Sequence, residues 1–384
     1  MRVAVAGGNL QGIETAYLAR KAGWEVLLID RRKQVPARGL CDSFLQIDAA
    51  SDELPAALRG VDILIPALED DKALAGLERA ARARELPFAF HPAAYRVSSS
   101  KVESNCLFRR LGIPLPRLWP EAGFPLIAKP SRSSGSRGLR ILRSRQELER
   151  NLPQFAPSQD WVLQELLQGR LYSLEILGSP GRHFPLQVTD LELDAGYECK
   201  RVLVPSHLAP EQVSEFESSA TALASALELK GLMDVEAILH QGELKVLEID
   251  ARVPSQTPTA VYWSTGWNMI EMLGRLFLDG PPPRPPRESA ARGVVYEHIQ
   301  VREESLEVGG EHLISRADPL SLRRDFFGAN EAITNYAPGR KQWVATLIFC
   351  GSTREEAWER RGETIRALRE HFELGRCADP EPLP

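Results

Sequence analysis

Three acidic side chains stand at spacings that favour binding of a divalent cation. Glu236 lies in the segment MDVEAIL, and Glu248 and Asp250 lie in VLEIDAR. Both segments read as strands, and the turn HQGE between them predicts a hairpin. Because side chains alternate along a strand, the hairpin places all three carboxylates on one face. Carboxylates gathered near a core repel one another unless cations lie between them, so the pattern predicts a Mg²⁺ site that also meets phosphate groups.

The alternative interpretation of this hairpin is a charged edge strand that faces solvent. The residues around the acids are Val246, Leu247, Ile249 and Ala251, and these apolar side chains favour a half-buried strand instead. Arg252 follows two residues after Asp250 and could hold a phosphate or a carboxylate.

A lysine and a serine–glycine loop suit the phosphates of a nucleotide. Lys129 ends the apolar run FPLIAK and precedes PSRSSGSRG, whose amides and hydroxyls could surround a γ-phosphate. Lys101 begins a predicted helix and could reach the same phosphates. The segment LQELLQG (163–169) ends a strand whose backbone could pair with an adenine edge. Taken singly, each of these features also suits a surface lysine or an ordinary loop.

The N-terminal segment has a degenerate glycine fingerprint. The glycines of GGNLQG are Gly7, Gly8 and Gly12, between a predicted strand and helix, and Asp30 ends the next strand. Asp30 could hold a ribose hydroxyl or a ligand ammonium, yet any turn of a doubly wound sheet also needs glycines. A nicotinamide-dependent oxidoreductase built on this unit is therefore an open alternative, although no hydride-transfer site is evident further along the chain.

Steps in composition and periodicity predict three domains. Residues 1–95 read as a small doubly wound domain with further strands at 61–68 and 87–90. Residues 96–178 begin with a helix that serines cap and Gly112 ends, followed by a small β-rich lobe. Residues 179–384 form a larger α+β domain that carries the acidic hairpin and a proline-rich loop at 279–293.

The composition argues against several classes of protein. The net charge is −5, with 43% hydrophobic and 26% charged residues, so no basic field for nucleic acid or acidic membranes exists overall. Five scattered cysteines without a C-x-x-C pair disfavour a disulfide framework and a structural zinc site. No apolar run approaches the ~20 residues of a membrane helix, and the opening MRVAVAGG reads as a strand rather than a signal peptide. We therefore expect a cytoplasmic protein that binds neither nucleic acid nor membrane.

The order of these motifs along the chain resembles the ATP-grasp superfamily of carboxylate–amine ligases. The series is Lys101, GIPLP, Lys129, the serine–glycine loop, LQELLQG, SLEI, MDVEA and LEIDAR, and it covers nearly the whole chain. The resemblance implies an ATP-grasp fold of α/β and α+β parts, with a Rossmann-like N-terminal domain, a small lid lobe and a larger C-terminal domain. Relatives usually carry Glu-x-Asn where this chain has Glu248-Ile249-Asp250, so the third metal ligand departs from the common pattern.

Within the superfamily, four segments look like the ligases of pyrrolysine biosynthesis, which join the carboxylate of (3R)-3-methyl-D-ornithine to the ε-amine of L-lysine. The segments are GGNLQGIETAYLARKAGWEVLLID, AYRVSSSK, GLMDVEA and EIDARVPSQTPTAVYWSTG. The most specific pieces are LQG and PSQTPT. The same-class alternative is another ATP-grasp amino-acid or dipeptide ligase, and a non-catalytic nucleotide-binding module is a third reading.

The resemblance implies a set of site residues and cofactors. Lys129 and Arg252 would be catalytic, with ATP and two Mg²⁺ ions as cofactors and the two amino acids as substrates, and a homodimer is one option for the oligomeric state. The metal ligands would be Glu236, Glu248 and Asp250. The ATP contacts would be Lys101, Lys129, Ser133, Ser134, Gly135, Ser136, Gln164, Glu165, Leu166, Leu167 and Glu175, with Asn9, Asp30 and Asp48 as further contacts for nucleotide or substrate. Lysine would meet Leu10, Gln11 and Glu69, and ornithine would meet Glu198, Asp234, Arg252, Ser255 and Thr257.

Overall fold

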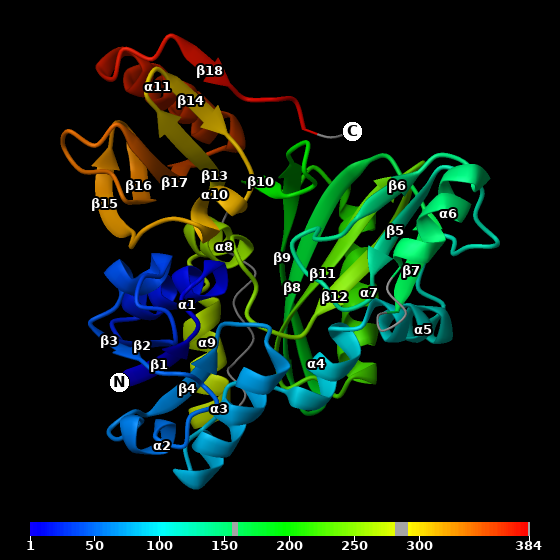
Figure 1. The fold of residues 1–384 in the computed structure, drawn as a ribbon, viewed down its shortest axis with the longest axis horizontal. Coiled ribbons are helices and arrows are strands. Elements are labelled where there is room, and N and C mark those ends of the chain that lie inside the picture. The colour runs from blue at the N-terminus through cyan, green and yellow to red at the C-terminus, as the bar shows by residue number, and fades with distance from the viewer. Residues whose placement is uncertain (156–159, 281–290, 383–384) are drawn as a thin grey trace. The chain divides into compact units, whose positions relative to one another are not determined.

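The computed structural model describes residues 1–155, 160–280 and 291–382, and these residues form two compact units (Figure 1). Unit 1 consists of Met1–Phe90, Cys199–Ser206 and Arg252–Glu381. Unit 2 consists mainly of His91–Glu198 and His207–Ala251. The division into three domains at residues 95 and 178 stays a prediction. Most of the loop predicted at 279–293 lies outside the described residues.

Unit 1 begins with the predicted βαβ arrangement. Its four parallel strands lie in the order β3-β2-β1-β4. The prediction of a strand at 87–90 was wrong, because Phe88 forms only an isolated bridge to Leu64. Pro87 has no N–H group with which to extend the pairing. The elements are β1 (Arg2–Ala6), α1 (Leu10–Lys21), β2 (Glu25–Asp30), the 3-10 helix η1 (Pro36–Leu40), β3 (Ser43–Gln46), α2 (Leu54–Ala57), β4 (Ile63–Pro66) and α3 (Asp71–Ala83).

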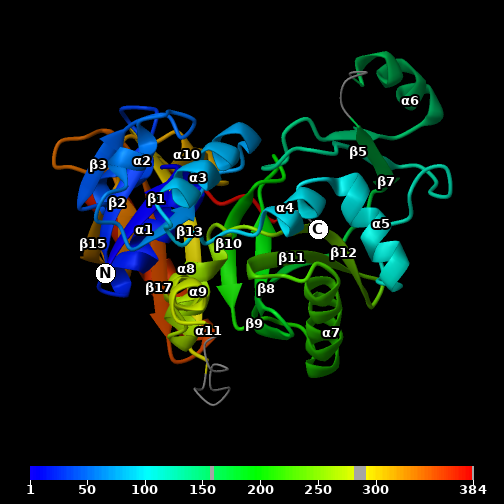
Figure 2. The same ribbon diagram turned by 90° about the horizontal axis from the view of Figure 1, so that it is seen from below.

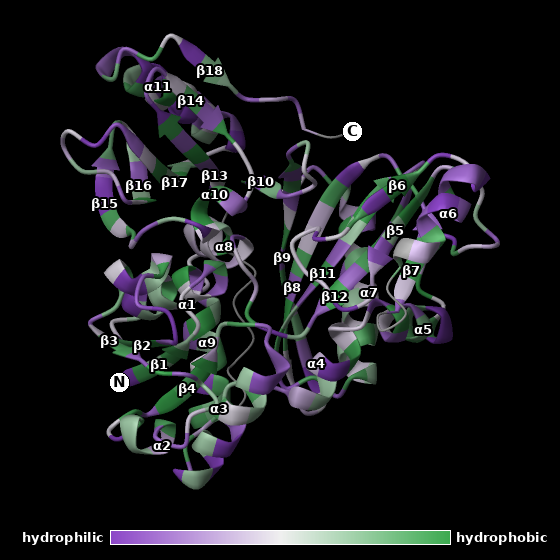
Figure 3. Ribbon diagram, viewed as in Figure 1, coloured by the Kyte–Doolittle hydropathy of each residue, from purple (hydrophilic) through white to green (hydrophobic). Residues whose placement is uncertain are grey.

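The remainder of unit 1 contains an antiparallel sheet with the order β10-β13-β17-β16-β15. Helix α11 packs its apolar side chains on β13 and β17, whose residues are almost all buried. Figure 3 colours the hydrophobic residues of these strands green. The elements are β10 (Cys199–Val204), α8 (Thr257–Thr265), α9 (Met269–Leu278), β13 (Gly293–Arg302), β14 (Ser305–Val308), α10 (His312–Ser315), β15 (Ser321–Phe326), β16 (Ala329–Thr334), β17 (Gln342–Gly351), α11 (Arg354–His371) and β18 (Arg376–Ala378).

Buried polar side chains tie α1 to this second sheet. The Glu14 carboxylate accepts hydrogen bonds from the Thr259 hydroxyl at 2.6 Å and the Tyr296 hydroxyl at 2.8 Å. The Tyr17 hydroxyl donates to Glu331 at 2.7 Å. Because buried polar groups are costly without partners, these bonds fix how α1 lies against α8, β13 and β16. The two sheets therefore belong to one unit although more than 100 residues of unit 2 separate them in the chain.

Unit 2 contains a small sheet with the order β6-β5-β7 and a larger one with the order β12-β11-β8-β9. The predicted helix begins at the cap Ser100 and ends at Gly112, which has φ +68°. The elements are α4 (Pro92–Ser98), α5 (Lys101–Leu111), β5 (Leu126–Pro130), β6 (Arg140–Leu142), α6 (Arg145–Asn151), the 3-10 helix η2 (Leu152–Gln154), β7 (Trp161–Glu165), β8 (Arg170–Ser179), β9 (Arg182–Leu193), α7 (Pro210–Ala226), β11 (Gly231–His240) and β12 (Glu243–Asp250).

The larger sheet of unit 2 has one apolar face. Leu174 on β8 and Met233 and Val235 on β11 pack with Phe216 and Leu223 of α7 in one buried cluster. Figure 2 shows α7 along this sheet. Because strand side chains alternate, the residues between these apolar positions face the other side, and that side carries the predicted site. Among the described residues, no helix combines the length and apolarity that crossing a bilayer requires.

Candidate active site

The strand register of unit 2 brings the predicted acids together on one face of the sheet. Glu236 on β11 lies opposite Glu248 on β12, and Asp234 lies opposite Asp250. Asp234 also lies opposite Glu175 on the other neighbouring strand, β8. Residues directly opposite in antiparallel strands share a face, so five carboxylates line it. This is the arrangement that the HQGE hairpin predicts.

A β-bulge adjusts the face in a way that alternation alone does not predict. The register shifts after Glu236, so that Ala237 pairs with Val246 and Leu247 is the extra residue. Val246 and Ile249 are both buried in the apolar cluster although an odd number of positions separates them. The bulge therefore keeps Val246 in the core while Glu248 and Asp250 stay on the acidic face.

Lys101 connects the acidic face to the serine–glycine loop. Its Nζ lies 2.9 Å from Glu248 Oε2 and donates to the Ser133 carbonyl oxygen at 2.8 Å. Burial would lower the pKa of Lys101, but the carboxylates of Glu248, Asp250 and Glu236 outweigh it and raise that pKa. Lys101 therefore stays charged where phosphate groups are predicted to bind.

Lys129 is a second cation of this region, with a different environment. Burial lowers the pKa of its ammonium, and the positive charge of Lys101 lowers this pKa further. The negative charges of Glu248 and Glu236 act in the opposite direction but do not outweigh burial. Within the described ranges its side chain has no hydrogen-bond or ion-pair partner. A ligand phosphate would supply the missing anion and favour the charged form.

The loop from Ser131 to Leu139 is held at its first residue and again at Ser136, where the backbone curls. Ser131 contacts Ser100 at 3.2 Å between hydroxyl oxygens, which ties the loop to the first turn of α5. The Ser136 hydroxyl donates to the Tyr197 carbonyl at 2.7 Å. Gly135 and Ser136 have φ of +60° and +53°, and Ser134 contacts Arg137 through its carbonyl and hydroxyl oxygens. Positive φ values turn successive amides toward one side, as anion-binding loops do.

The predicted hinge, Gln164–Leu167, follows β7, and the Glu165 side chain is already engaged. Its carboxylate accepts from Arg117 Nε at 2.8 Å and from Lys245 Nζ at 3.0 Å. Burial would raise the pKa of Glu165, but these cations and the Arg117 amide lower it to about 2. Its side chain thus has a structural role that the sequence did not indicate. Gln164 pairs with Ile127 on β5, the Leu166 amide donates to the Pro125 carbonyl, and Leu167 follows half-buried.

A second predicted cluster lies in unit 1, around Glu69. Gln11 Nε2 donates to Glu69 Oε1 at 2.7 Å, and Arg252 Nε donates to the same atom, also at 2.7 Å. Leu10 precedes Gln11 at the start of α1. The structure therefore joins three residues that were predicted separately as lysine and ornithine contacts, although Arg252 lies 183 positions beyond Glu69.

The PSQTPT segment leads into α8 with a strained backbone and polar atoms that lack partners. Gln256, the cap residue of α8, has φ +71°, which side chains other than glycine rarely adopt. The buried Gln11 Oε1, Gln256 Oε1 and Thr257 Oγ1 atoms have no hydrogen-bond partner in the part of the chain that the structure describes. The Ser255 carbonyl accepts from the Thr257 amide at 2.8 Å. Buried polar atoms without hydrogen-bond partners and local backbone strain are typical of ligand sites. Gln256 was not predicted, and its place inside PSQTPT was the available signal.

Four predicted residues have local structural roles. Asp30 accepts from the Gly8 amide at 2.9 Å and from the Arg32 amide at 2.8 Å, so it fixes the glycine loop. Asn9 accepts from Arg32, and the exposed Asp48 accepts from the Ala50 amide at 2.9 Å. Glu198 follows β9, and its amide donates to Asp194. Ligand contacts by these four residues stay predictions.

The glycines of the first turn are required by close backbone approach. A Cβ on Gly12 would lie 2.1 Å from the Gly7 carbonyl oxygen, and a Cβ on Gly7 would lie 2.4 Å from that of Ala67. Gly7 also has φ +110°. These positions need glycine for packing whatever the loop binds.

The acidic face fits Mg²⁺ by its chemistry. Its donors are oxygens, which magnesium prefers, and two lysines and a serine-rich loop adjoin them for phosphates. Across the described residues, the carboxylate oxygens of Glu236, Glu248 and Asp250 do not all lie within 4.8 Å of one another. Lys101 lies against Glu248 instead.

Comparison with known proteins shows that the fold is that of the ATP-grasp class of ATP-dependent ligases. The model of the ATP-grasp domain matches residues 98–256. The biotin carboxylase domain of Hydrogenobacter thermophilus 2-oxoglutarate carboxylase, solved with MgADP, has a TM-score of 0.72 at 18% identity over 95% of this chain and 89% of its own. An L-amino acid ligase from Bacillus licheniformis has a TM-score of 0.70 at 17% identity over 95% and 97%.

The curated 3-methyl-D-ornithine–L-lysine ligase of Methanosarcina mazei is 35% identical over 375 residues, which are 96% of this chain and 96% of that ligase. The chain belongs to the ATP-grasp family of 3-methyl-D-ornithine–L-lysine ligases. The fold class and the ATP-dependent ligase activity predicted from the sequence are thereby confirmed.

Proposed function

We propose that this chain joins the carboxylate of (3R)-3-methyl-D-ornithine to the ε-amine of L-lysine, at the expense of ATP, in pyrrolysine biosynthesis. The observation that carries the proposal is the 35% identity to the Methanosarcina mazei ligase along nearly the full length of both chains. Two clusters support it: the acids and lysines of unit 2 suit MgATP, and the Glu69 cluster of unit 1 suits an amino acid.

In the first step, an ornithine carboxylate oxygen attacks the γ-phosphorus of ATP, and the bond between that phosphorus and ADP breaks. The product is an acyl phosphate. Lys101 and Lys129 neutralise the phosphate charge, and the loop 131–139 surrounds it, since positioning and charge neutralisation are most of what phosphoryl transfer requires. Magnesium, held by Glu236, Glu248 and Asp250, would neutralise the remaining phosphate charge.

In the second step, the lysine ε-nitrogen attacks the acyl carbon, phosphate leaves, and the nitrogen loses its extra proton. Glu69 pairs with the α-ammonium of lysine, while Arg252 and Asp234 line the ornithine side. Gln11 holds the Glu69 carboxylate at 2.7 Å and so orients it. The lobe of β5, β6 and β7 would close over ATP and keep water from the acyl phosphate.

Mass spectrometry tests the proposal directly. The full chain is incubated with ATP, Mg²⁺, L-lysine and D-ornithine as a stand-in substrate, and ADP and phosphate are quantified. We expect a product of dipeptide mass linked through the lysine ε-nitrogen, with one ADP for each amide. ADP formation only with another carboxylate and amine would keep the ligase class and discard these substrates. ATP binding without any product would indicate a non-catalytic nucleotide-binding module. A change in absorbance at 340 nm that depends on a nicotinamide cofactor would indicate an oxidoreductase.

Three finer points belong to the same proposal. We propose two Mg²⁺ ions, a homodimer and a cytoplasmic location. Metal titration of the ATP-bound enzyme would count the ions, and light scattering on a sizing column would give the mass of the assembly. Finding a single bound Mg²⁺ ion would contradict the proposal of two ions, and finding a monomer would contradict the homodimer. Neither result would change the proposed reaction.

A further inference from the structure

A cavity of about 220 Å³ lies in unit 1, and none of the residues that line it belongs to the predicted ATP and substrate sets. It is bordered by β13, by β17 and by α10 with the segment after it. Its walls carry the polar side chains Gln300, Arg302, His312, Arg316, Asp318 and Arg340. A cavity whose walls hold three guanidinium groups and one carboxylate attracts anions.

The three arginines differ in how they are held. Arg340 is fixed to the wall, because its NH2 atom lies 2.6 Å from Asp318 Oδ2 and its Nε donates to the Gln342 carbonyl at 2.7 Å. The guanidinium groups of Arg302 and Arg316 have neither a hydrogen bond nor an ion pair within residues 1–155, 160–280 and 291–382. Two positive charges at the cavity are therefore left without an anion.

Strand β13 adds buried polar atoms that also lack partners. His298, Gln300 and Arg302 occupy alternate positions, so they share one face of the strand, and Gln300 and Arg302 lie opposite Val344 and Gln342 on β17. Gln300 Oε1 and the Nε2 of the fully buried His298 have no hydrogen-bond partner among the described residues. A buried acceptor without a donor costs free energy, and a ligand that brings a donor removes that cost.

We propose that this cavity binds a phosphate group as the dianion of a monohydrogen phosphate or a phosphate monoester. Its two negative charges match the unpaired charges of Arg302 and Arg316, and the planar guanidinium group binds phosphate oxygens in pairs. When the group is monohydrogen phosphate, its P–OH proton is the donor that Gln300 Oε1 lacks. A carboxylate brings one charge and no proton, so it fits these groups less well. Phosphate binding in this cavity does not depend on which substrates the enzyme ligates.

Calorimetric titration of the full chain with inorganic phosphate tests the site. The ATP site is first filled with Mg²⁺ and a non-hydrolysable ATP analogue, so that its own phosphate contacts are occupied, and ionic strength is held constant with chloride. We expect one phosphate to bind for each chain. Absence of binding by both phosphate and AMP under these conditions would overturn the proposal.

Matched variants separate this site from general attraction to positive charge. Arg302→Gln and Arg316→Gln should each weaken phosphate binding about tenfold, as loss of one charge-assisted contact predicts. Arg323→Gln removes the same charge from an exposed position on β15 outside the cavity and should leave the affinity unchanged. Equal losses in all three variants, or no loss in the cavity variants, would contradict the proposal.

Competing anions identify the source of the phosphate group. Sulfate has the same charge but no proton to donate to Gln300, so it should bind more weakly than phosphate in the wild type. AMP that displaces phosphate, with the same dependence on Arg302 and Arg316, would assign the cavity to a nucleotide monophosphate. AMP that does not compete would assign it to free phosphate. Sulfate binding as tight as that of phosphate would remove the role given to Gln300.

Discussion

At the residue scale, the proposed chemistry depends on charges that a folded chain would ordinarily keep apart. Glu236 and Glu248 face each other across two strands, and Lys101 lies 2.9 Å from Glu248. Opposed carboxylates repel each other unless a cation lies near them, and here the Lys101 ammonium is such a cation. The Lys101 ammonium therefore offsets part of the repulsion between these carboxylates.

Replacing Glu248 with glutamine tests this arrangement. The amide keeps the shape of the side chain but removes the charge that would hold Mg²⁺ and that now pairs with Lys101. We expect turnover to fall at least about 100-fold, since it loses charge stabilisation of the phosphoryl transition state. ADP release at saturating MgATP measures the effect, and an unchanged circular dichroism spectrum would show that the fold persists. Near-normal ligation by this variant would remove the metal assignment.

His298 should make the stability of unit 1 depend on pH. Burial, helped by the nearby His312, lowers its pKa from 6.5 to about 3, so the folded protein favours the neutral ring. The unfolded chain binds the proton near pH 6.5, so this contribution is fully present above that pH and is lost as pH falls toward 3. The slope from one such group is about 1.4 kcal/mol per pH unit.

Urea unfolding of the wild type and of His298→Gln between pH 4 and 8.5 checks this expectation. Glutamine can still bond to Thr346, which lies 2.9 Å from His298 Nδ1, but cannot titrate. The variant should lose less stability than the wild type below pH 6.5. The two slopes should agree between pH 7 and 8.5, where neither side chain titrates. Parallel curves over the whole range would show that His298 is not the group responsible.

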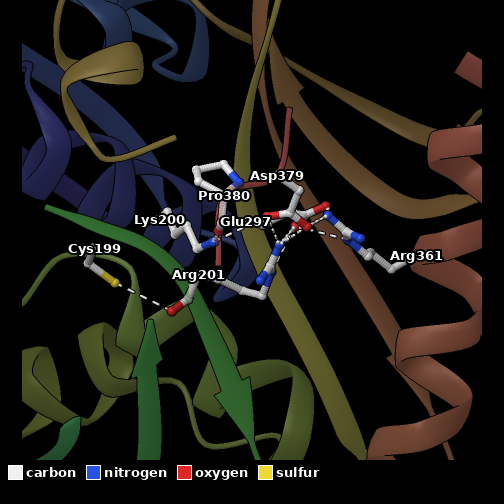
Figure 4. A network of polar contacts seen from close by, with 7 residues as sticks. All are labelled: Cys199, Lys200, Arg201, Glu297, Arg361, Asp379 and Pro380. Carbon is white, nitrogen blue, oxygen red and sulfur yellow. Dashed lines mark hydrogen bonds and ion pairs between the residues drawn. The ribbon is translucent and has the colours of Figure 1, made fainter. Parts of the chain in front are cut away.

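At the element scale, the C-terminal segment is held by cations that are almost fully buried. Lys200 and Arg201, on β10, are 0% and 2% exposed. Asp379 lies just beyond β18, 3.2 Å from Lys200 Nζ and 2.8 Å from Arg201 NH2, and it lies 2.6 Å from Arg361 on α11 (Figure 4). Glu297 on β13 also lies 2.8 Å from Arg201 NH2. The Asp379 carboxylate thus ties the segment after β18 to β10 and α11.

Changing Asp379 to asparagine should destabilise unit 1 by about 2–3 kcal/mol. Removing one partner from a buried ion pair leaves charge without compensation, and Glu297 alone cannot balance three cations. Chemical denaturation followed by circular dichroism measures the change in the free energy of unfolding. Glu381→Gln, a neighbouring exposed acid, is the control and should have little effect. A result for Asp379→Asn as small as the control would show that the network contributes little.

At the scale of the whole molecule, the lysines and acids proposed to bind MgATP and the Glu69 cluster proposed to bind lysine lie on different units. Lys101, Lys129 and the acidic hairpin belong to unit 2, whereas Gln11, Glu69 and Arg252 belong to unit 1. Each cluster is completed by contacts within its own unit, at 2.9 Å for Lys101–Glu248 and 2.7 Å for Arg252–Glu69. The two binding functions should therefore respond separately to mutation.

Glu69→Gln should separate them. We expect the KM for lysine to rise at least about tenfold, because an ammonium loses its charged partner, while the KM for ATP changes less than about twofold. Initial rates with each substrate varied in turn give both values. The control is Glu78→Gln, which removes an exposed acid of the same unit and should leave both KM values unchanged. Gln11 is not used as a control because it contacts Glu69. A parallel rise in the KM for ATP would contradict the separation.

The local parts of the site were determined by the sequence itself. The HQGE turn, the alternation of Glu248 with Asp250, the cap at Ser100 and the helix end at Gly112 all follow from interactions within a few residues, and the structure contains each of them. Such features depend on the fixed periods of strands and helices and on the preferences of caps, which neighbouring residues specify.

Only the tertiary structure decided which distant residues meet. Arg252 donates a hydrogen bond to Glu69, 183 positions away in the chain. The Glu165 carboxylate accepts hydrogen bonds from Arg117 and Lys245. The bulge at Leu247 depends on which side of β12 is covered by the core. No local period encodes such pairings, because they are chosen by the packing of whole elements and by the cost of leaving buried charges without partners.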